Sequence, residues 1–318
     1  MRLTAFSQLI WFASIVCVCA TEKPVFDWDA IQYVYAFGDS YSFVQGTAGH
    51  PNFSFIGDAI EFPFAPRELL TNEIIPKNTS SEGSNWLEFL TGCFEGRPSN
   101  CGIQLWNFAF AGADIDAALL PLHHDFTIPL VDQVKQWKRF ASKILPRPPR
   151  KTLTTWWIGI NDTGDTVFNT TISNFTAFWE AEITSYFNAV QLALDNGLTG
   201  AHLFINVPPE ERSPATLGNS TKVALMKEHI DLFNVILGQH IDRFQHTHSA
   251  TTVFRFDAHE WFNTVLDSPA SFGFTNTTGF CTCLEPGFFW YNSGHPTERV
   301  HELLSEAIRN HLVAASNQ

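Results

Sequence analysis

The chain has 318 residues, of which 16% are charged, and a formal net charge of −13 at pH 7. Such an excess of carboxylates disfavours nucleic acid as a partner, because binding to nucleic acid depends on Lys and Arg neutralising phosphates. Strongly anionic substrates are disfavoured for the same reason. The length suits one large domain. No Gly/Ser linker or repeat divides the sequence, so we predict a single domain over residues 21–318.

The first twenty residues have the layout of a secretory signal peptide. Arg2 is the only charged side chain before Glu22, and the run from Ala5 to Ala20 is mostly apolar and ends in small residues. This run of about 16 residues is shorter than the ~20 that a transmembrane helix needs. We therefore predict a signal peptide over residues 1–20, a secreted extracellular protein, and no stable membrane anchor.

Secretion is consistent with the cysteines and the N-x-S/T sequons of the remaining chain. Four cysteines are left after removal of the signal, and an even number in a secreted chain predicts two disulfides. Cys93–Cys101 would close a short loop, whereas Cys281–Cys283 would close a strained ring, so a long-range pairing is an alternative. Six sequons are predicted to carry N-glycans at the surface: Asn52, Asn78, Asn169, Asn174, Asn219 and Asn276.

Short apolar runs alternate with segments of helical periodicity. The runs that predict strands are 33–37, 103–108, 152–158, 201–207 and 251–256. Apolar residues recur at helical spacing over 131–145, 175–194, 223–244 and 300–312, and Thr297 is the candidate N-cap of the last helix. Near-continuous apolar strands suit a parallel sheet that is covered on both faces. The alternation predicts a three-layer α/β/α fold with a five-stranded parallel sheet.

Polar motifs stand where such a fold binds ligands, beyond the carboxyl ends of its strands. Ser40, in the sequence GDSY, follows the first strand, and Gly112, in NFAFAGA, follows the second. A glycine there lets the backbone approach a bound oxygen closely. Asn161, in GIND, follows the third strand as an uncharged donor, and His295, in NSGHPT, precedes the last helix. Each motif alone also fits an ordinary turn or helix start.

Two other histidine groups contain side chains that ligate metals. They are His123-His124-Asp125 and His259-Glu260. Neither has a second ligand pair at helical spacing, so we predict that both lie on surface loops and that no metal is bound.

Taken together, the four motifs resemble the SGNH hydrolases, the superfamily of GDSL-type lipases and esterases. Ser40, Gly112, Asn161 and His295 occur in the order that gives the superfamily its name, and the resemblance spans Phe37 to Thr297. Within the superfamily the chain looks most like the secreted fungal acetylesterases of carbohydrate esterase family sixteen. That narrower resemblance rests on FGDSY, on INVPPEERSP over residues 205–214, and on an asparagine three residues before the histidine. It implies the SGNH hydrolase (flavodoxin-like) fold and no cofactor.

The resemblance also implies a role for each motif. Ser40 would attack an ester carbonyl, and His295 would take its proton and return it to the leaving alcohol. The backbone N–H groups of Ser40 and Gly112 and the side-chain amide of Asn161 would form the oxyanion hole. Asn161 should then be buried in the site, and we expect it to be unglycosylated although it starts a sequon.

One position departs from the superfamily pattern. Many members have an aspartate three residues before the histidine, where this chain has Asn292. An amide oxygen can orient the imidazole, but it cannot stabilise an imidazolium by charge. Asp257, which follows the fifth predicted strand, is a weaker alternative for the orienting group.

We expect a serine esterase that removes small acyl groups, acetyl above all, from sugars or oligosaccharides through an acyl-enzyme on Ser40, acting as a monomer. The alternative is a GDSL-type lipase or lysophospholipase that acts on longer acyl chains. A catalytically silent glycan-binding protein is the third reading, and the four intact motif residues argue against it. Activity should fall as the pH drops through the pKa of the histidine, about 6.5 in model peptides, unless the site shifts that pKa.

Overall fold

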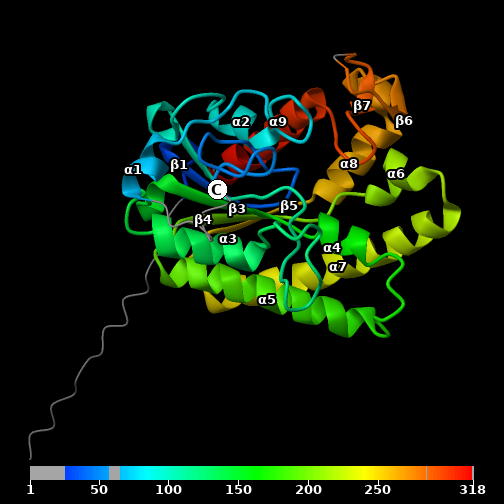
Figure 1. Cartoon of the computed structure of the whole chain (residues 1–318), viewed down its shortest axis with the longest axis horizontal. Helices are drawn as coiled ribbons and strands as arrows, with labels where there is room; N and C mark the ends of the chain where they lie inside the picture. The colour runs from blue at the N-terminus through cyan, green and yellow to red at the C-terminus, as the bar shows by residue number, and fades with distance from the viewer. Residues whose placement is uncertain (1–25, 57–64, 284, 317–318) are drawn as a thin grey trace, which may run out of the picture.

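A five-stranded parallel sheet forms the middle layer of the protein (Figure 1). The computed structural model describes residues 26–56, 65–283 and 285–316, so the predicted signal peptide lies outside the described residues. The sheet has the order β2-β1-β3-β4-β5, and each neighbouring pair is parallel. Its strands are β1 (Tyr33–Gly38), β2 (Gln104–Asn107), β3 (Thr152–Trp157), β4 (Ala201–Ile205) and β5 (Val253–Phe256). The predicted α/β class and all five predicted strands are confirmed.

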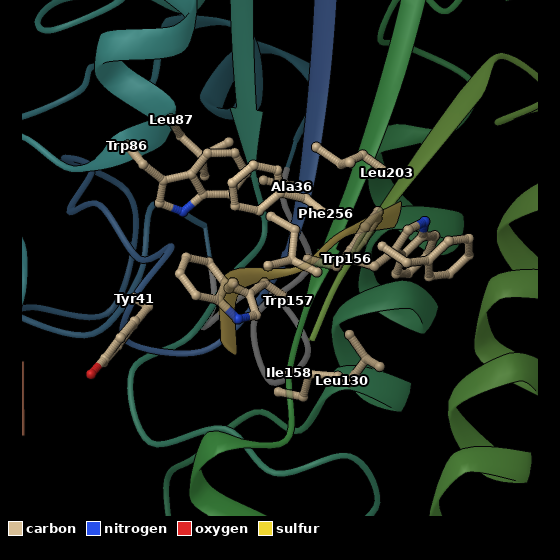
Figure 2. Close-up of a cluster of buried hydrophobic side chains, with 14 of the residues drawn as sticks. Ala36, Tyr41, Trp86, Leu87, Leu130, Trp156, Trp157, Ile158, Leu203 and Phe256 are labelled. Atoms are coloured by element: carbon tan, nitrogen blue, oxygen red, sulfur yellow. The ribbon is translucent and has the colours of Figure 1, made fainter. Parts of the chain in front are cut away.

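The central strand β3 shows why the sheet must be covered on both faces. All six of its residues are buried, and its consecutive tryptophans point to opposite faces, as successive strand residues do. Trp156 stacks on Phe37 with ring centroids 4.8 Å apart. Trp157 meets Tyr41 and Trp86 edge to face on the other side (Figure 2). The Trp157 indole N–H donates to the carbonyl of Asn206 at 3.0 Å, so burial leaves it satisfied.

Helices cover the two faces as the periodicity predicts (Figure 1). On one face lie α3 (Leu130–Gln136), α5 (Phe175–Asp195) and α7 (Ser220–Thr247), and on the other α2 (Trp86–Thr91) and α9 (Glu298–Ser316). The predicted helix over 131–145 is only partly α-helical, because α3 passes into a π-helical segment, Trp137–Ala141. The short helices α1 (Pro66–Thr71) and α2 were not predicted, since each has only six residues.

Several unpredicted elements gather beyond the carboxyl ends of the strands (Figure 1). They include α4 (Ile160–Asp165), α6 (Pro214–Leu217) and α8 (Ala258–Asp267), which follow β3, β4 and β5. A second, two-stranded sheet of β6 (Asn276–Phe280) and β7 (Phe288–Trp290) leads into α9. Thr297 precedes α9 as predicted, but its hydroxyl donates to the carbonyl of Phe288 at 3.2 Å instead of capping the helix.

The four cysteines that the structure describes form two disulfides, both local. Cys93 is joined to Cys101, and Cys281 to Cys283. The long-range pairing that the sequence left open is therefore absent, and the tight ring forms. Within the described residues, no helix is long and apolar enough to span a membrane.

The six predicted glycosylation positions all keep exposed surface. Asn52, Asn174 and Asn219 are exposed, and Asn78, Asn169 and Asn276 are half-buried. Two of them already have a structural role, because the side-chain oxygens of Asn174 and Asn219 cap α5 and α7. N-glycans attach to the amide nitrogen, so these caps are compatible with modification. Glycosylation stays a prediction.

Candidate active site

The structure brings Ser40 and His295 together although they are 255 residues apart in the chain. Ser40 is the second residue after β1, and His295 lies on the loop between β7 and α9. The hydroxyl oxygen of Ser40 is 2.8 Å from Nε2 of His295. The turn that presents Ser40 depends on Gly38, because a Cβ atom at that position would lie 2.2 Å from the carbonyl oxygen of Trp157.

Asn292 fixes the tautomer of His295. Its side-chain oxygen accepts hydrogen bonds from the backbone N–H groups of Gly294 and His295, at 3.0 and 2.9 Å. These two donors identify the oxygen of the amide. The same oxygen is 2.9 Å from Nδ1 of His295, so Nδ1 must carry the proton. Nε2 is then the bare nitrogen, and the hydroxyl of Ser40 donates to it. This arrangement is that of a nucleophile next to a general base.

The imidazole is in a poor environment for positive charge. His295 keeps some exposed surface, but its ring lies among Tyr41, Ser40 and the uncharged Asn292. This loss of water lowers the pKa of His295 to about 4. The value is well below the ordinary 6.5 that the sequence suggested, and the histidine therefore stays a neutral base down to weakly acidic pH.

We expect the substitution Asn292→Asp to move the acid limb of the pH–kcat profile upward by about one to three pH units. The reason is that a carboxylate beside Nδ1 would stabilise the imidazolium, so the histidine would become protonated, and inactive as a base, at higher pH. Profiles measured from pH 3 to 8 check this. Asp257→Asn is the matched control and should leave the limb near pH 4, because Asp257 caps α8 instead of contacting His295. If the acid limb of Asn292→Asp stayed at the wild-type pH, the proposed effect of the neutral Asn292 on the pKa of His295 would be contradicted.

Three hydrogen-bond donors near Ser40 have no protein acceptor within the described part of the chain. They are the backbone N–H groups of Ser40 and Gly112 and the second N–H of the Asn161 side chain. Their neighbours are bonded: the N–H of Tyr41 donates to Asp39, and that of Ala113 to Phe110. Gly112 has φ +81°, a left-handed conformation that favours glycine. Unpaired donors of this kind are what an oxyanion hole requires.

Asn161 is less buried than the sequence suggested. The residue is half-buried, and its Nδ2 donates one hydrogen bond to the carbonyl of Ala113 at 2.9 Å. It lies in the first turn of α4, at the rim of the layer, which explains the remaining exposure. The other two sequon residues, Asp162 and Thr163, are fully buried. This burial supports the expectation that the sequon is not modified in the folded chain.

Two buried aspartates connect the segments that carry the three donors. The carboxylate of Asp39, next to Ser40, accepts from the backbone N–H groups of Tyr41 and Ile160. Asp162, next to Asn161, accepts from the N–H of Ile115 at 2.9 Å. The turn after β1, the start of α4 and the loop after β2 are thus held together. Sequence reasoning treated both aspartates only as turn residues, although each stands inside a recognised motif.

Burial behind the donors favours the neutral form of these carboxyl groups. Burial raises the pKa of Asp39 to about 8. It also raises the pKa of Asp162, Asp114 and Glu182, and neighbouring carboxyls add to the effect. A cluster of ionised carboxylates would repel a developing oxyanion, so keeping these groups largely protonated suits a site where negative charge forms.

Of the two other histidine groups, His123-His124-Asp125 lies on a surface loop as predicted, whereas His259-Glu260 does not, because both residues belong to α8 and His259 is half-buried. His123 and His124 are exposed, and Nδ1 of His123 contacts Asp165 at 2.7 Å. The pair lies closer to the site than expected, since a Cβ atom at Gly112 would be 3.1 Å from the His123 ring. Across the residues that the structure describes, no group of three or more His, Cys, Asp or Glu side chains could hold a metal ion.

A cavity of about 420 Å³ lies elsewhere, behind the loop that carries His295. Its lining includes Glu82, Tyr291, Glu298 and Glu302, but neither Ser40 nor His295. The size of this cavity therefore says nothing about the space over the candidate nucleophile, and we assign the chemistry to the Ser40–His295 pair.

Two comparisons with known proteins match most of the chain. A family model described as GDSL-like Lipase/Acylhydrolase matches residues 34–308. An acetylesterase from Thermothelomyces thermophilus is 29% identical over 303 residues, which cover 91% of this chain and 91% of that protein.

Solved structures resemble the chain less closely. A carbohydrate acetylesterase from Sinorhizobium meliloti has a TM-score of 0.47 and 13% identity, covering 89% of this chain and 99% of that one. An extracellular lipase from Streptomyces rimosus has a TM-score of 0.41 and 14% identity, covering 90% and 98%. Both scores lie below 0.5, so neither likeness supports a substrate.

Proposed function

This chain belongs to the GDSL-like lipase/acylhydrolase family, and on that premise we propose that it is a secreted esterase that removes small acyl groups, acetyl above all, from sugars or oligosaccharides. The observation that carries the proposal is the 2.8 Å contact between the Ser40 hydroxyl and the bare Nε2 of His295. The predicted signal peptide and the two disulfides support secretion. We also propose that the enzyme acts as a monomer and without a cofactor.

In the proposed mechanism, the Ser40 oxygen attacks the ester carbonyl while its proton moves to Nε2 of His295. The tetrahedral intermediate collapses by breaking the bond to the leaving alcohol, which takes the proton back from Nε2. An acyl-enzyme on Ser40 remains. A water molecule then attacks it, with His295 again taking and returning one proton, and the free acid leaves. Asn292 orients the imidazole throughout.

In this proposal the carbonyl oxygen gains its negative charge facing the three unpaired donors of Ser40, Gly112 and Asn161. Such donors stabilise the transition state more than the ground state, because the charge develops only during the reaction. The family resemblance and the absence of protein acceptors for these groups within the described residues support this role.

Aromatic rings flank the candidate site and suit a sugar ring. Phe126, which is 38% exposed, stacks between the rings of His50 and His124, with centroids 4.9 and 5.1 Å apart. His124 also lies against Gly112. Both faces of Phe126 are thus covered, so in this proposal a pyranose would pack its C–H face on the outer face of one of the histidine rings. The acetylesterase from Thermothelomyces thermophilus and the resemblance to carbohydrate esterase family sixteen support acetyl as the acyl group.

A chain-length series of p-nitrophenyl esters, from acetate to palmitate, tests the acyl specificity. We expect kcat/KM to be highest for acetate and to fall at least about tenfold by octanoate, because forcing extra methylenes into a pocket sized for acetyl costs about 1–3 kcal/mol. Assays below the critical micelle concentration avoid interfacial effects. A maximum at octanoate or longer would replace the proposal by the alternative, a lipase or lysophospholipase on the same machinery.

A further inference from the structure

The phenol of Tyr41, next to the candidate nucleophile, contacts two oxygens from distant parts of the chain. Its hydroxyl is 2.6 Å from Oε1 of Glu210 and 2.8 Å from the backbone carbonyl of Gly294. Gly294 directly precedes His295. Tyr41 is 1% exposed, and its ring packs 5.6 Å from the ring of His295 and edge to face on Trp157 (Figure 2).

The phenol contacts of Tyr41 can both be full hydrogen bonds only if the carboxyl group of Glu210 is protonated. The phenol has one proton, and burial raises the pKa of Tyr41 further, so it does not ionise. The carbonyl of Gly294 can only accept, and it therefore takes the phenol proton. A hydrogen bond between the phenol oxygen and Glu210 at 2.6 Å then needs a proton from the carboxyl group. In this arrangement Glu210 donates to the phenol of Tyr41, and Tyr41 donates to the carbonyl of Gly294.

The surroundings of Glu210 favour its neutral form. The residue is 6% exposed, and burial raises the pKa of its carboxyl to about 8. Nearby Glu211 and Asp39 raise it further, while the charge of Lys222 acts in the opposite direction, as a hydrogen bond donated by Tyr41 to the carboxylate would. The rings of His295, which is half-buried, and His301, which is buried, also pack against Tyr41, and loss of water lowers the pKa of both.

We propose that protonated Glu210 is a positioning residue that holds the His295 loop in place through Tyr41, and that loss of its proton releases this hold. The proposal rests on the function proposed above. When Glu210 ionises, the phenol proton turns to the carboxylate, because hydrogen bonds to a charged acceptor are stronger. The carbonyl of Gly294 then loses its donor in a buried place, and the loop that carries His295 loses a contact.

The segment around Glu210 is itself fixed, which makes it a suitable support. Glu210–Arg212 forms a 3₁₀ turn, and Arg212 reaches α8, where it contacts Asn263 and Asp267, each at 2.7 Å. The N–H of Ala215 donates to the carbonyl of Ser293, a second bond to the histidine loop, at 2.9 Å. Tyr41, which contacts Glu210, and Ala215, which directly follows the PPEERSP stretch, thus contact the two consecutive carbonyls before His295.

The pH dependence of kcat tests this proposal. Hydrolysis of ethyl acetate, followed by titration of the released acid from pH 5 to 10, avoids the rapid spontaneous hydrolysis of p-nitrophenyl esters in alkali. We expect the wild-type kcat to fall above a midpoint near pH 8, where Glu210 ionises. Glu210→Gln should rescue the alkaline activity, because its amide donates to the phenol at every pH. Re-assay at pH 7 after each incubation excludes irreversible unfolding.

Two further variants separate positioning from general packing. Tyr41→Phe keeps the ring but removes the donor to Gly294, and should lower kcat by about five- to tenfold from pH 5 to 10 with KM unchanged. The kcat of Tyr41→Phe should also show no fall near pH 8. Glu211→Gln is the matched control, since Glu211 is buried on the same turn but does not face Tyr41. This variant should retain the alkaline limb, moved to lower pH because Glu211 no longer raises the pKa of Glu210.

Thermal unfolding gives a readout that needs no activity. The carboxyl of Glu210 has a raised pKa in the folded state, so its contribution to stability is complete below the ordinary pKa, near 4.5, and is lost as the pH rises through about 8. The Tm of Glu210→Gln minus that of wild type should therefore grow from pH 5 to 8 and level off above 8.

The outcomes separate this proposal from the proposed function. A Glu210→Gln variant that keeps the alkaline limb, or that is less active and less stable than wild type at pH 7, would overturn the positioning role. The first result would assign the limb to another group, such as Asp39, whose pKa is also raised to about 8. Full activity in Ser40→Ala would instead overturn the proposed function and leave the Glu210 stability result valid.

Discussion

Replacing Ser40 by alanine is expected to lower kcat for p-nitrophenyl acetate by about 10⁴-fold or more. The reason is that the hydroxyl facing Nε2 of His295 is the only group in the proposed mechanism that forms the bond to the acyl carbon. The fold should be unaffected, since the change removes one oxygen and a single hydrogen bond, worth about 1 kcal/mol. Steady-state rates and thermal unfolding of the purified variant measure both effects.

Ser42→Ala provides the matched control two residues away. Its hydroxyl is buried as well, but it accepts a hydrogen bond from the indole of Trp86 instead of facing His295. Removing it leaves that indole N–H unpaired in the core, so the Tm should fall while turnover is retained. Turnover that survives in Ser40→Ala would be incompatible with the proposed nucleophile.

His295→Ala is expected to lower kcat for the same ester by about 10⁴-fold. Without an imidazole at 2.8 Å, the Ser40 hydroxyl has no base to take its proton, and an unionised serine is a weak nucleophile. Asn292→Ala should lower kcat less than His295→Ala, because His295 would remain and would lose only the hydrogen-bond partner of its Nδ1.

Added imidazole separates a lost base from a damaged fold. The alanine leaves a space where the ring stood, and free imidazole in solution should restore part of the activity of His295→Ala but none of that of Ser40→Ala. If His295→Ala kept turnover near the wild-type value, or if imidazole rescued both variants equally, His295 would not be the general base.

The sheet and the long helices could be predicted because burial on one or two faces dictates their patterns. All residues of β3 are buried, and the sequence there is apolar or Thr throughout. The β6–β7 pair could not be predicted, since the residues of β6 alternate only between half-buried and exposed and none is fully buried. Its course depends on pairing with β7 and on a disulfide whose formation the sequence left open.

The residues of the candidate site could be located by motif, but their pKa values could not be predicted from the sequence. A pKa depends on how much water the fold removes, which is why His295 and Glu210 differ so far from their ordinary values in opposite directions. The contact between Tyr41 and Glu210 joins positions 169 residues apart, and no local pattern announces it. The sequence hint of this contact was the pair of acidic residues, Glu210 and Glu211, which lie in a buried turn after β4.

The most direct measurement of the central claim is covalent labelling with an organophosphate, a reagent that traps an activated serine, followed by peptide mass spectrometry. The account predicts a single adduct, on the peptide that contains Ser40. Its rate of formation should depend on a group with a pKa near 4 and should fall steeply in His295→Ala. An adduct on a different serine, or labelling of Ser40 that is equally fast without the imidazole, would contradict it.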